Sequence, residues 1–127
     1  MIVVDASAAL AALLNDGPAR RALGAEQIHV PHLIDSEITN ALRRKVAVGQ
    51  IAADAAWVAL ASWRRLGIVR YPVFGILGRI WQLRDNLSAY DASYVALAEH
   101  LDCTLLTADG RLSRATGVRC PMLVVPR

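Results

Sequence analysis

Short apolar runs alternate along the chain with longer stretches in which apolar residues recur every three or four positions. The short runs predict strands and the recurrence predicts helices, because each pattern turns apolar side chains toward one side of its element. The predicted strands are residues 2–4, 28–30, 68–71, 104–106 and 122–125. The predicted helices are residues 6–14, 19–23, 33–48, 52–66, 76–83, 88–101 and 110–115.

Turn-forming residues separate these elements. The run Asn15-Asp16-Gly17-Pro18 ends the first helix, Gly49 ends the third, and Pro31 and Pro72 end the strands before them. The alternation predicts an α/β fold, with a five-stranded parallel sheet sandwiched between helices. No repeat or linker interrupts it, so residues 1–127 are expected to form one domain. Ligands of such sheets bind beyond the carboxyl ends of the strands, where the strand order reverses.

The composition is that of a globular protein, with 55% apolar residues and a net charge of +3. No apolar run reaches the roughly 18 residues that a membrane helix requires. The N-terminal residues also lack the pattern of a secretory signal, so we expect a cytoplasmic protein without membrane association. Cys103 and Cys120 form neither a disulfide framework nor a zinc site, and their apolar surroundings predict buried thiols.

Four of the eleven acidic residues follow the geometry of the predicted sheet. Asp5 directly follows the first strand, and Asp109 directly follows the fourth. Glu37 lies in the helix after the second strand, and Asp91 lies in the first turn of the helix before the fourth. In a parallel sheet all four can reach one edge, where they would repel one another unless a cation neutralises them. A set of oxygen ligands suits Mg²⁺ or Mn²⁺.

Each of these residues also has a structural explanation. Asp5 can cap the first helix, although Ser7 can fill the same role. Ser88 and Asp91 have the spacing of a capping box, and Asp109 precedes a glycine at a turn. Glu37 is harder to explain in this way.

Glu37 shares a helix face with Ile34 and Ala41, where an unpaired charge is costly. The other seven acids are assigned to turns, helix ends and exposed helix faces, and they are Asp16, Glu26, Asp35, Asp54, Asp85, Glu99 and Asp102.

The basic and aromatic residues leave two interpretations open. The run Arg43-Arg44-Lys45 ends the Glu37 helix and is either an RNA contact or a solvated face that favours the helix dipole. The three tryptophans can stack on bases, but at helical spacing we favour positions in the core or at an interface. They are Trp57, Trp63 and Trp81. His29 and His32 do not form a metal pair, because Pro31 breaks a helical presentation.

Taken together, the acidic positions lie in segments that resemble PIN domains and, within them, the VapC-type toxins. The matching segments are Val3-Val4-Asp5-Ala6-Ser7, Pro31, Glu37-Ile38-Thr39-Asn40-Ala41-Leu42, Tyr90-Asp91-Ala92-Ser93-Tyr94-Val95-Ala96-Leu97-Ala98 and Leu105-Leu106-Thr107-Ala108-Asp109. The resemblance runs through nearly the whole chain. It implies a five-stranded parallel sheet between helices and metal-dependent cleavage of RNA phosphodiesters.

The resemblance also implies roles for individual residues. Its acidic metal ligands correspond to Asp5, Glu37, Asp91 and Asp109. Thr107 matches a position whose hydroxyl supports the site, and Ser7 and Asn40 match positions near the metal. Some relatives carry another acid or amide a few residues past the last ligand, where this chain has Leu112 and Ser113. A firmly held second metal is therefore not expected.

The partners implied by the resemblance are an RNA substrate, a small VapB-like antitoxin and a second copy of the chain. The antitoxin would lie along an apolar groove near the first helices and block the acidic site. The alternative from another class is a non-catalytic α/β binding module, whose acidic cluster holds a structural cation or binds only a protein. A receiver-like domain would need an aspartate at the end of the third strand, where Tyr71 and Pro72 stand.

Overall fold

Five parallel strands form the centre of the computed structural model, which describes residues 1–127. The strands are β1 (Ile2–Val4), β2 (Ile28–Pro31), β3 (Ile68–Tyr71), β4 (Thr104–Thr107) and β5 (Met122–Val124). Their order in the sheet is β3-β2-β1-β4-β5. The chain therefore builds outward from β1 to one side and then returns to the other side of β1. The strand order reverses between β1 and β4, which pair in parallel from Ile2 to Val4.

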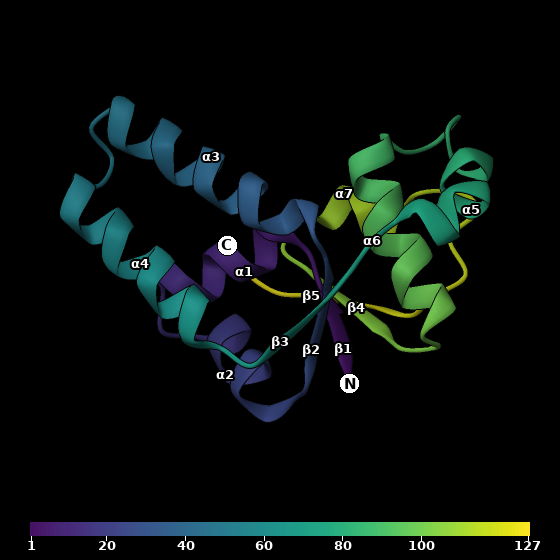
Figure 1. The fold of residues 1–127 in the computed structure, drawn as a ribbon, viewed down its shortest axis with the longest axis horizontal. Coiled ribbons are helices and arrows are strands. Elements are labelled where there is room, and N and C mark those ends of the chain that lie inside the picture. Colours follow the sequence, from purple (N-terminus) through teal and green to yellow (C-terminus); the bar gives the residue numbers. More distant parts are fainter.

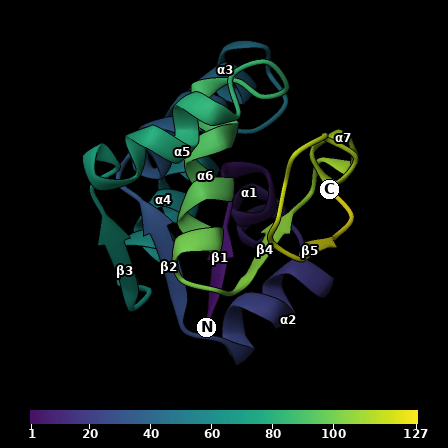
Figure 2. The same cartoon turned by 90° about the vertical axis from the view of Figure 1, so that its right-hand side faces the viewer.

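Helices cover both faces of the sheet (Figure 1). They are α1 (Ala6–Leu14), α2 (Pro18–Ala25), α3 (Leu33–Ala47), α4 (Ala53–Arg65), α5 (Leu77–Gln82), α6 (Ala89–His100) and α7 (Gly110–Ser113), with a 3₁₀ turn at Phe74–Ile76. Helix α6 lies across β1, β2 and β4, with α5 beside it (Figure 2). Helix α1 packs on the opposite face and contacts α2, α3 and α4. The predicted five-stranded parallel sheet between helices is confirmed.

The predicted element boundaries agree with the structure to within two residues, and the helix expected over residues 76–83 is α5. A 3₁₀ turn that was not predicted precedes it, so Phe74–Gln82 forms two short helical pieces. Gly75 and Gly78 lie in this segment, and glycine lowers helix propensity because its backbone loses more freedom on folding. The segment is held chiefly by its packing against α6.

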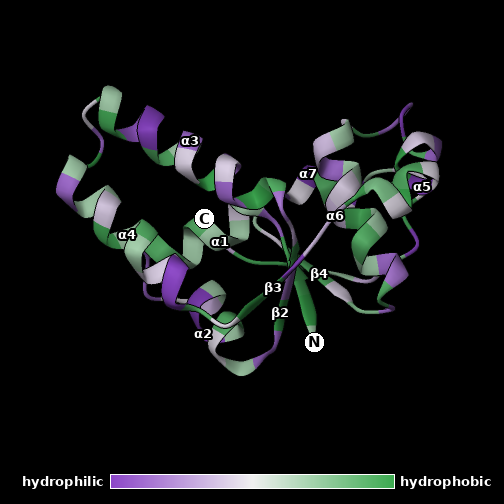
Figure 3. Cartoon of the chain, in the orientation of Figure 1, coloured by the Kyte–Doolittle hydropathy of each residue, from purple (hydrophilic) through white to green (hydrophobic).

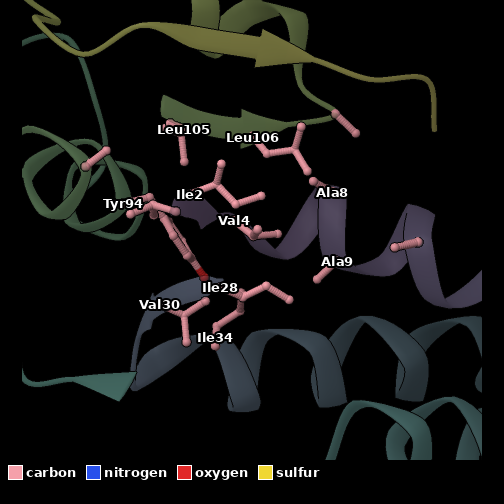
Figure 4. Close-up of a cluster of buried hydrophobic side chains, with 14 of the residues drawn as sticks. Ile2, Val4, Ala8, Ala9, Ile28, Val30, Ile34, Tyr94, Leu105 and Leu106 are labelled. Atoms are coloured by element: carbon pink, nitrogen blue, oxygen red, sulfur yellow. The ribbon is translucent and has the colours of Figure 1, made fainter. Parts of the chain in front are cut away.

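The core lies on both sides of β1. Val3 and Val4 are fully buried, and the seven consecutive residues of α6 from Ala92 to Ala98 are buried as well. Figure 4 shows Val4 and Tyr94 within this core. Such a helix has no polar face because it packs against the middle of the sheet and under neighbouring elements. Hydrophobic residues dominate β1, whereas hydrophilic residues interrupt the α3–α4 hairpin that extends beyond the sheet (Figure 3).

The tryptophans and cysteines divide between interior and surface. Trp63 is buried in the core as expected, but Trp57 and Trp81 are 58% and 67% exposed. Cys103 is buried and Cys120 is partly buried, and both are free thiols. No helix has the length and apolar character needed to cross a membrane.

Candidate active site

The central strands β1 and β4 bring Asp5 and Thr107 to the same edge of the sheet. The Asp5 N–H donates to the Leu106 carbonyl at 3.1 Å, which continues the pairing of β1 with β4. This edge is where the strand order reverses, the position at which α/β sheets bind ligands. Helix α7 and the first turns of α1 and α3 lie close to it (Figure 1).

Asp5 is only 5% exposed and accepts three hydrogen bonds. Its Oδ1 accepts from Ser7 Oγ at 2.6 Å and from the Ala8 N–H at 2.9 Å, and its Oδ2 accepts from Thr107 Oγ1 at 2.5 Å. Asp5, rather than Ser7, is therefore the N-cap of α1. Burial raises the pKa of Asp5, the three hydrogen bonds offset part of this rise, and the charge of Asp109 adds to it.

Ser7 and Thr107 tie Asp5 to the loop after β4. Ser7 Oγ accepts from the Ala108 N–H at 2.9 Å, and Thr107 Oγ1 accepts from the Asp109 N–H at 3.0 Å. Each hydroxyl thus donates to the Asp5 carboxylate while accepting from the backbone. This pairing leaves both Asp5 oxygens fixed in place.

Glu37 reaches the site from α3, and it has one side-chain partner. The buried Tyr94 hydroxyl, on α6, donates to Glu37 Oε1 at 2.5 Å. Burial raises the pKa of Glu37, the Tyr94 hydrogen bond lowers it in part, and the charges of Asp91 and Asp5 raise it further. Figure 4 shows the Tyr94 side chain extending from α6 toward the β2–α3 segment. Tyr94 was not among the predicted site residues; its signal in the sequence is a phenol hydroxyl within the largely apolar run from Ala92 to Ala98.

Asp91 lies in the first turn of α6, as expected. Its N–H donates to Ser88 Oγ at 3.2 Å, so the predicted Ser88 cap is confirmed. The Asp91 side chain nevertheless belongs with Asp5, Glu37 and Asp109 to one group of carboxylates, called the acidic set below. Burial raises the pKa of its carboxyl, and the charges of Asp5 and Asp109 raise it further.

Asp109 is the N-cap of α7 and accepts from the Arg111 N–H at 3.0 Å. The Arg111 guanidinium also contacts both of its oxygens at 3.3 Å. These hydrogen bonds hold the pKa of Asp109 below its ordinary value. Arg111 was not singled out in the sequence, although it lies two residues from a predicted ligand.

The charges of the four carboxylates influence one another, but the carboxylates do not yet form a metal-binding group. No three side chains of His, Cys, Asp or Glu are close enough to form a ready-made metal-binding group. Three of the four carboxyls nevertheless have raised pKa values to which their acidic neighbours contribute. The donors are all oxygen atoms, the type that Mg²⁺ and Mn²⁺ prefer. The residues therefore fit a divalent cation.

The other predicted site residues lie in two places. Asn40 is exposed and accepts from Arg43 Nε at 3.0 Å, so neither side chain contacts the acidic set. Arg44 and Lys45 instead line a cavity that also contains Glu37. Leu112 is buried in the core and has no side-chain oxygen to offer to the site.

Two acidic residues that were assigned only to a helix face or a helix end form specific side-chain contacts. The expectation that Glu99 lies on an exposed helix face is wrong. It forms an ion pair with Arg79 at 2.6 Å, and the two side chains are only 13% and 19% exposed. Asp35 lies in the first turn of α3, as expected, but it also accepts from Arg70 Nε and Trp63 Nε1, each at 2.7 Å. Both partners come from elements distant in the sequence.

This fold and site define a class: an α/β domain with carboxylates gathered near the point where the strand order of its sheet reverses. The family model described as PIN domain matches residues 2–118. A VapC ribonuclease of Mycobacterium bovis is 61% identical over 127 residues, covering 100% of both chains. The chain therefore belongs to the PIN domain family and, within it, to the VapC ribonucleases.

Solved structures share the fold at lower identity. The Mycobacterium tuberculosis VapC20 toxin matches with a TM-score of 0.69 at 20% identity, over 94% of this chain and 97% of that one. A chain of the Rickettsia felis VapBC2 structure matches with a TM-score of 0.68 at 12% identity, over 97% and 99%. At these identities the two structures support the fold alone.

Proposed function

We propose that residues 1–127 act as one nuclease domain that hydrolyses RNA phosphodiester bonds with Mg²⁺ or Mn²⁺, as the toxin of a VapBC-type toxin–antitoxin pair. The observation that best supports this proposal is that the carboxylates of the acidic set repel one another. Burial and mutual repulsion raise the pKa values of Asp5, Glu37 and Asp91, and no cationic side chain forms an ion pair with any of them. An external cation would relieve that repulsion.

Asp5, Glu37, Asp91 and Asp109 are the proposed ligands. When bound, the cation would polarise the scissile phosphate and lower the pKa of an attacking water. Ser7 and Thr107 would hold the Asp5 carboxylate in one orientation, as supporting hydrogen bonds around metal sites do.

Asn40 is proposed near the metal only by resemblance. It lies on α3 beyond Glu37, and it would have to release Arg43 to join the site. Arg44 and Lys45 are the better-placed candidates for RNA contact, since they line the cavity next to Glu37.

A partly apolar groove near the first helices supports the proposed antitoxin partner. A cavity of about 370 Å³ between α1, α2 and α4 is lined mainly by Ala12, Leu13, Leu23 and Leu66. A second exposed apolar surface comprises Phe74, Leu77 and Trp81, and it supports the proposed homodimer. We also propose a cytoplasmic location, where the chain would meet an RNA substrate and an antitoxin.

The test is incubation of the purified chain with a panel of cellular RNAs in Mg²⁺, Mn²⁺ or chelator. Chelator should abolish cleavage and either ion should restore it. Cleavage that continues unchanged in chelator would contradict the metal dependence. Binding of RNA without any cleavage in all three conditions would instead favour the non-catalytic alternative.

A further inference from the structure

A basic cavity adjoins the acidic set on the side of α1 and α3. Its volume is about 450 Å³, and its lining includes Ser7, Glu37, Arg44, Lys45 and Arg127. Three cationic side chains therefore share one depression with a proposed metal ligand and with the hydroxyl that fixes Asp5. The cavity borders the reaction centre directly.

The three cations of this basic cavity have no partner within the chain. The four ion pairs of the protein involve Met1, Arg70, Arg79 and Arg111, and none involves Arg44, Lys45 or Arg127. They are also not engaged in side-chain hydrogen bonds. Three cationic side chains without ion-pair partners outnumber Glu37, the one acidic side chain that lines the same depression, so the depression attracts an anion.

These cations do not serve to neutralise Glu37. The pKa of Glu37 is raised by burial and by its acidic neighbours, and no basic residue is among the causes of its shift. The charge of Arg127 contributes instead to the lowered pKa of Asp109, after the larger effects of Arg111 and of burial. Arg127 thus influences the charge of Asp109 while it also lines the basic cavity beside Glu37.

The opposite side of the acidic set differs in charge. A depression of about 280 Å³ there is lined by Ser88, Asp91, Asp109 and Arg111, among others. Its single cation, Arg111, is already paired with Asp109. Among the residues that line these two depressions, unpaired cationic side chains occur only in the basic cavity.

Arg43 provides an internal comparison. It belongs to the same basic run as Arg44 and Lys45, but it lines a separate depression with Asp35, Thr39 and Asn40. Its Nε already donates to Asn40. The run is therefore divided between two faces of α3, and only one face borders the acidic set.

We propose that the basic cavity binds the RNA phosphate next to the scissile one, through Arg44, Lys45 and Arg127 and without Arg43. This rests on the proposed ribonuclease function. RNA is favoured over an acidic protein segment because Glu37 and Ser7 line the cavity, so that its occupant lies beside the phosphodiester to be cut. Arginine suits the contact because its guanidinium binds phosphate oxygens in pairs.

The test is the salt dependence of binding to a labelled single-stranded RNA, measured in chelator so that the strand stays intact. Arg44→Ala, Lys45→Ala and Arg127→Ala should each weaken binding. Each should also reduce the slope of log affinity against log salt by roughly 0.7, the value for one lost phosphate contact on a single strand. Arg43→Ala is the matched control and should leave both quantities unchanged.

Three results would overturn the basic cavity as an RNA site while the ribonuclease function stands. One is cleavage of RNA with unchanged binding in the three variants, and another is an equal loss in Arg43→Ala. Loss of antitoxin binding with unchanged RNA binding would assign the cavity to the protein partner and overturn the proposal too. A chain that neither binds nor cuts RNA would refute the ribonuclease function itself, and the inference with it.

Discussion

Glu37 on α3 and Glu99 on α6 are both glutamates on helices, and the protein treats their charges in opposite ways. Glu99 accepts two hydrogen bonds from Arg79, at 2.6 and 3.1 Å, and one from the Arg119 N–H at 3.0 Å. Burial would raise its pKa, but these bonds and the charges of Arg79 and Arg119 outweigh burial and lower it. Glu37 has only the neutral Tyr94 hydroxyl, and its pKa is raised.

The same contrast separates Asp35 from Asp5. Asp35 is paired with Arg70, whose hydrogen bond is the main reason that its pKa is lowered. Asp5 accepts only from hydroxyls and one N–H, and its pKa is raised. Where the chain supplies a cation, the carboxylate holds elements together. Where it supplies only neutral donors, the carboxylate stays fixed but uncompensated and remains available to an external cation.

The largest effect is expected when one of the carboxylates without a cationic partner loses its charge, and it is the loss of RNA cleavage in Asp5→Asn. Asparagine retains the helix cap but removes the charge at the most buried position of the set. We expect cleavage to slow by about a hundredfold or more, as the loss of several kcal/mol of transition-state stabilisation implies. Expression of the original chain should arrest growth, and expression of the variant should not. Equal arrest by both proteins would place the toxic activity elsewhere.

Glu99→Gln should instead destabilise the fold. The substitution leaves the largely buried Arg79 guanidinium without its counter-charge. The expected loss in the free energy of unfolding at neutral pH is about 1.5–3 kcal/mol, the value of hydrogen bonds to charged groups. Urea denaturation measures it. Cleavage per folded molecule should be retained.

The pH dependence of this loss follows from the lowered pKa of Glu99. The folded state releases the proton more readily than the unfolded state, so the ion pair contributes its full stability above the ordinary value of 4.5. The contribution is lost as the pH falls through the folded-state pKa. The difference in stability between the original chain and Glu99→Gln should therefore narrow below about pH 4.5. A difference that stays constant down to pH 3 would argue against the ion pair as its source.

Glu37→Gln applies the same chemical change to the other member of the pair. Without metal, we expect a free energy of unfolding that is unchanged or higher by up to about 1 kcal/mol, since the change removes repulsion from Asp91 and Asp5. The Tyr94 hydroxyl can still donate to the amide oxygen. The same urea experiment measures it. A loss as large as that in Glu99→Gln would remove the distinction between the two carboxylates.

The sequence indicated the positions of Asp5 and Asp109 because each follows a strand, and a parallel sheet brings strand ends together. It did not indicate which carboxylates have cationic partners. Arg79 lies 20 residues from Glu99, and Tyr94 lies 57 residues from Glu37, so both contacts depend on how helices pack. Asp35 and Arg70 likewise meet only through the pairing of β2 with β3. Local pattern predicts elements and their ends, whereas the state of a charge depends on tertiary neighbours.

The smallest expected effect is the change in metal-free stability in Asp91→Asn. Asp91 lies in the first turn of a helix and also belongs to the acidic set. Asp54 is the matched control, because it is an exposed carboxylate in the first turn of α4. Each Asp→Asn change removes a favourable interaction with the helix dipole of about 0.3–1 kcal/mol. In Asp91→Asn this loss should be offset by relief of repulsion from Asp5 and Asp109, so that metal-free stability changes less than in Asp54→Asn.

The decisive comparison for Asp91 is the rise in melting temperature on adding Mn²⁺. A cation that binds only the folded state raises stability in proportion to the logarithm of its concentration over Kd. If Asp91 is a ligand, Asp91→Asn weakens binding and the rise shrinks, whereas Asp54→Asn keeps the full rise. If Asp91 only stabilises the start of α6, both variants keep it and both keep cleavage. That second result would return Asp91 to the class of carboxylates that serve the fold alone, and the cation would then be held by Asp5, Glu37 and Asp109.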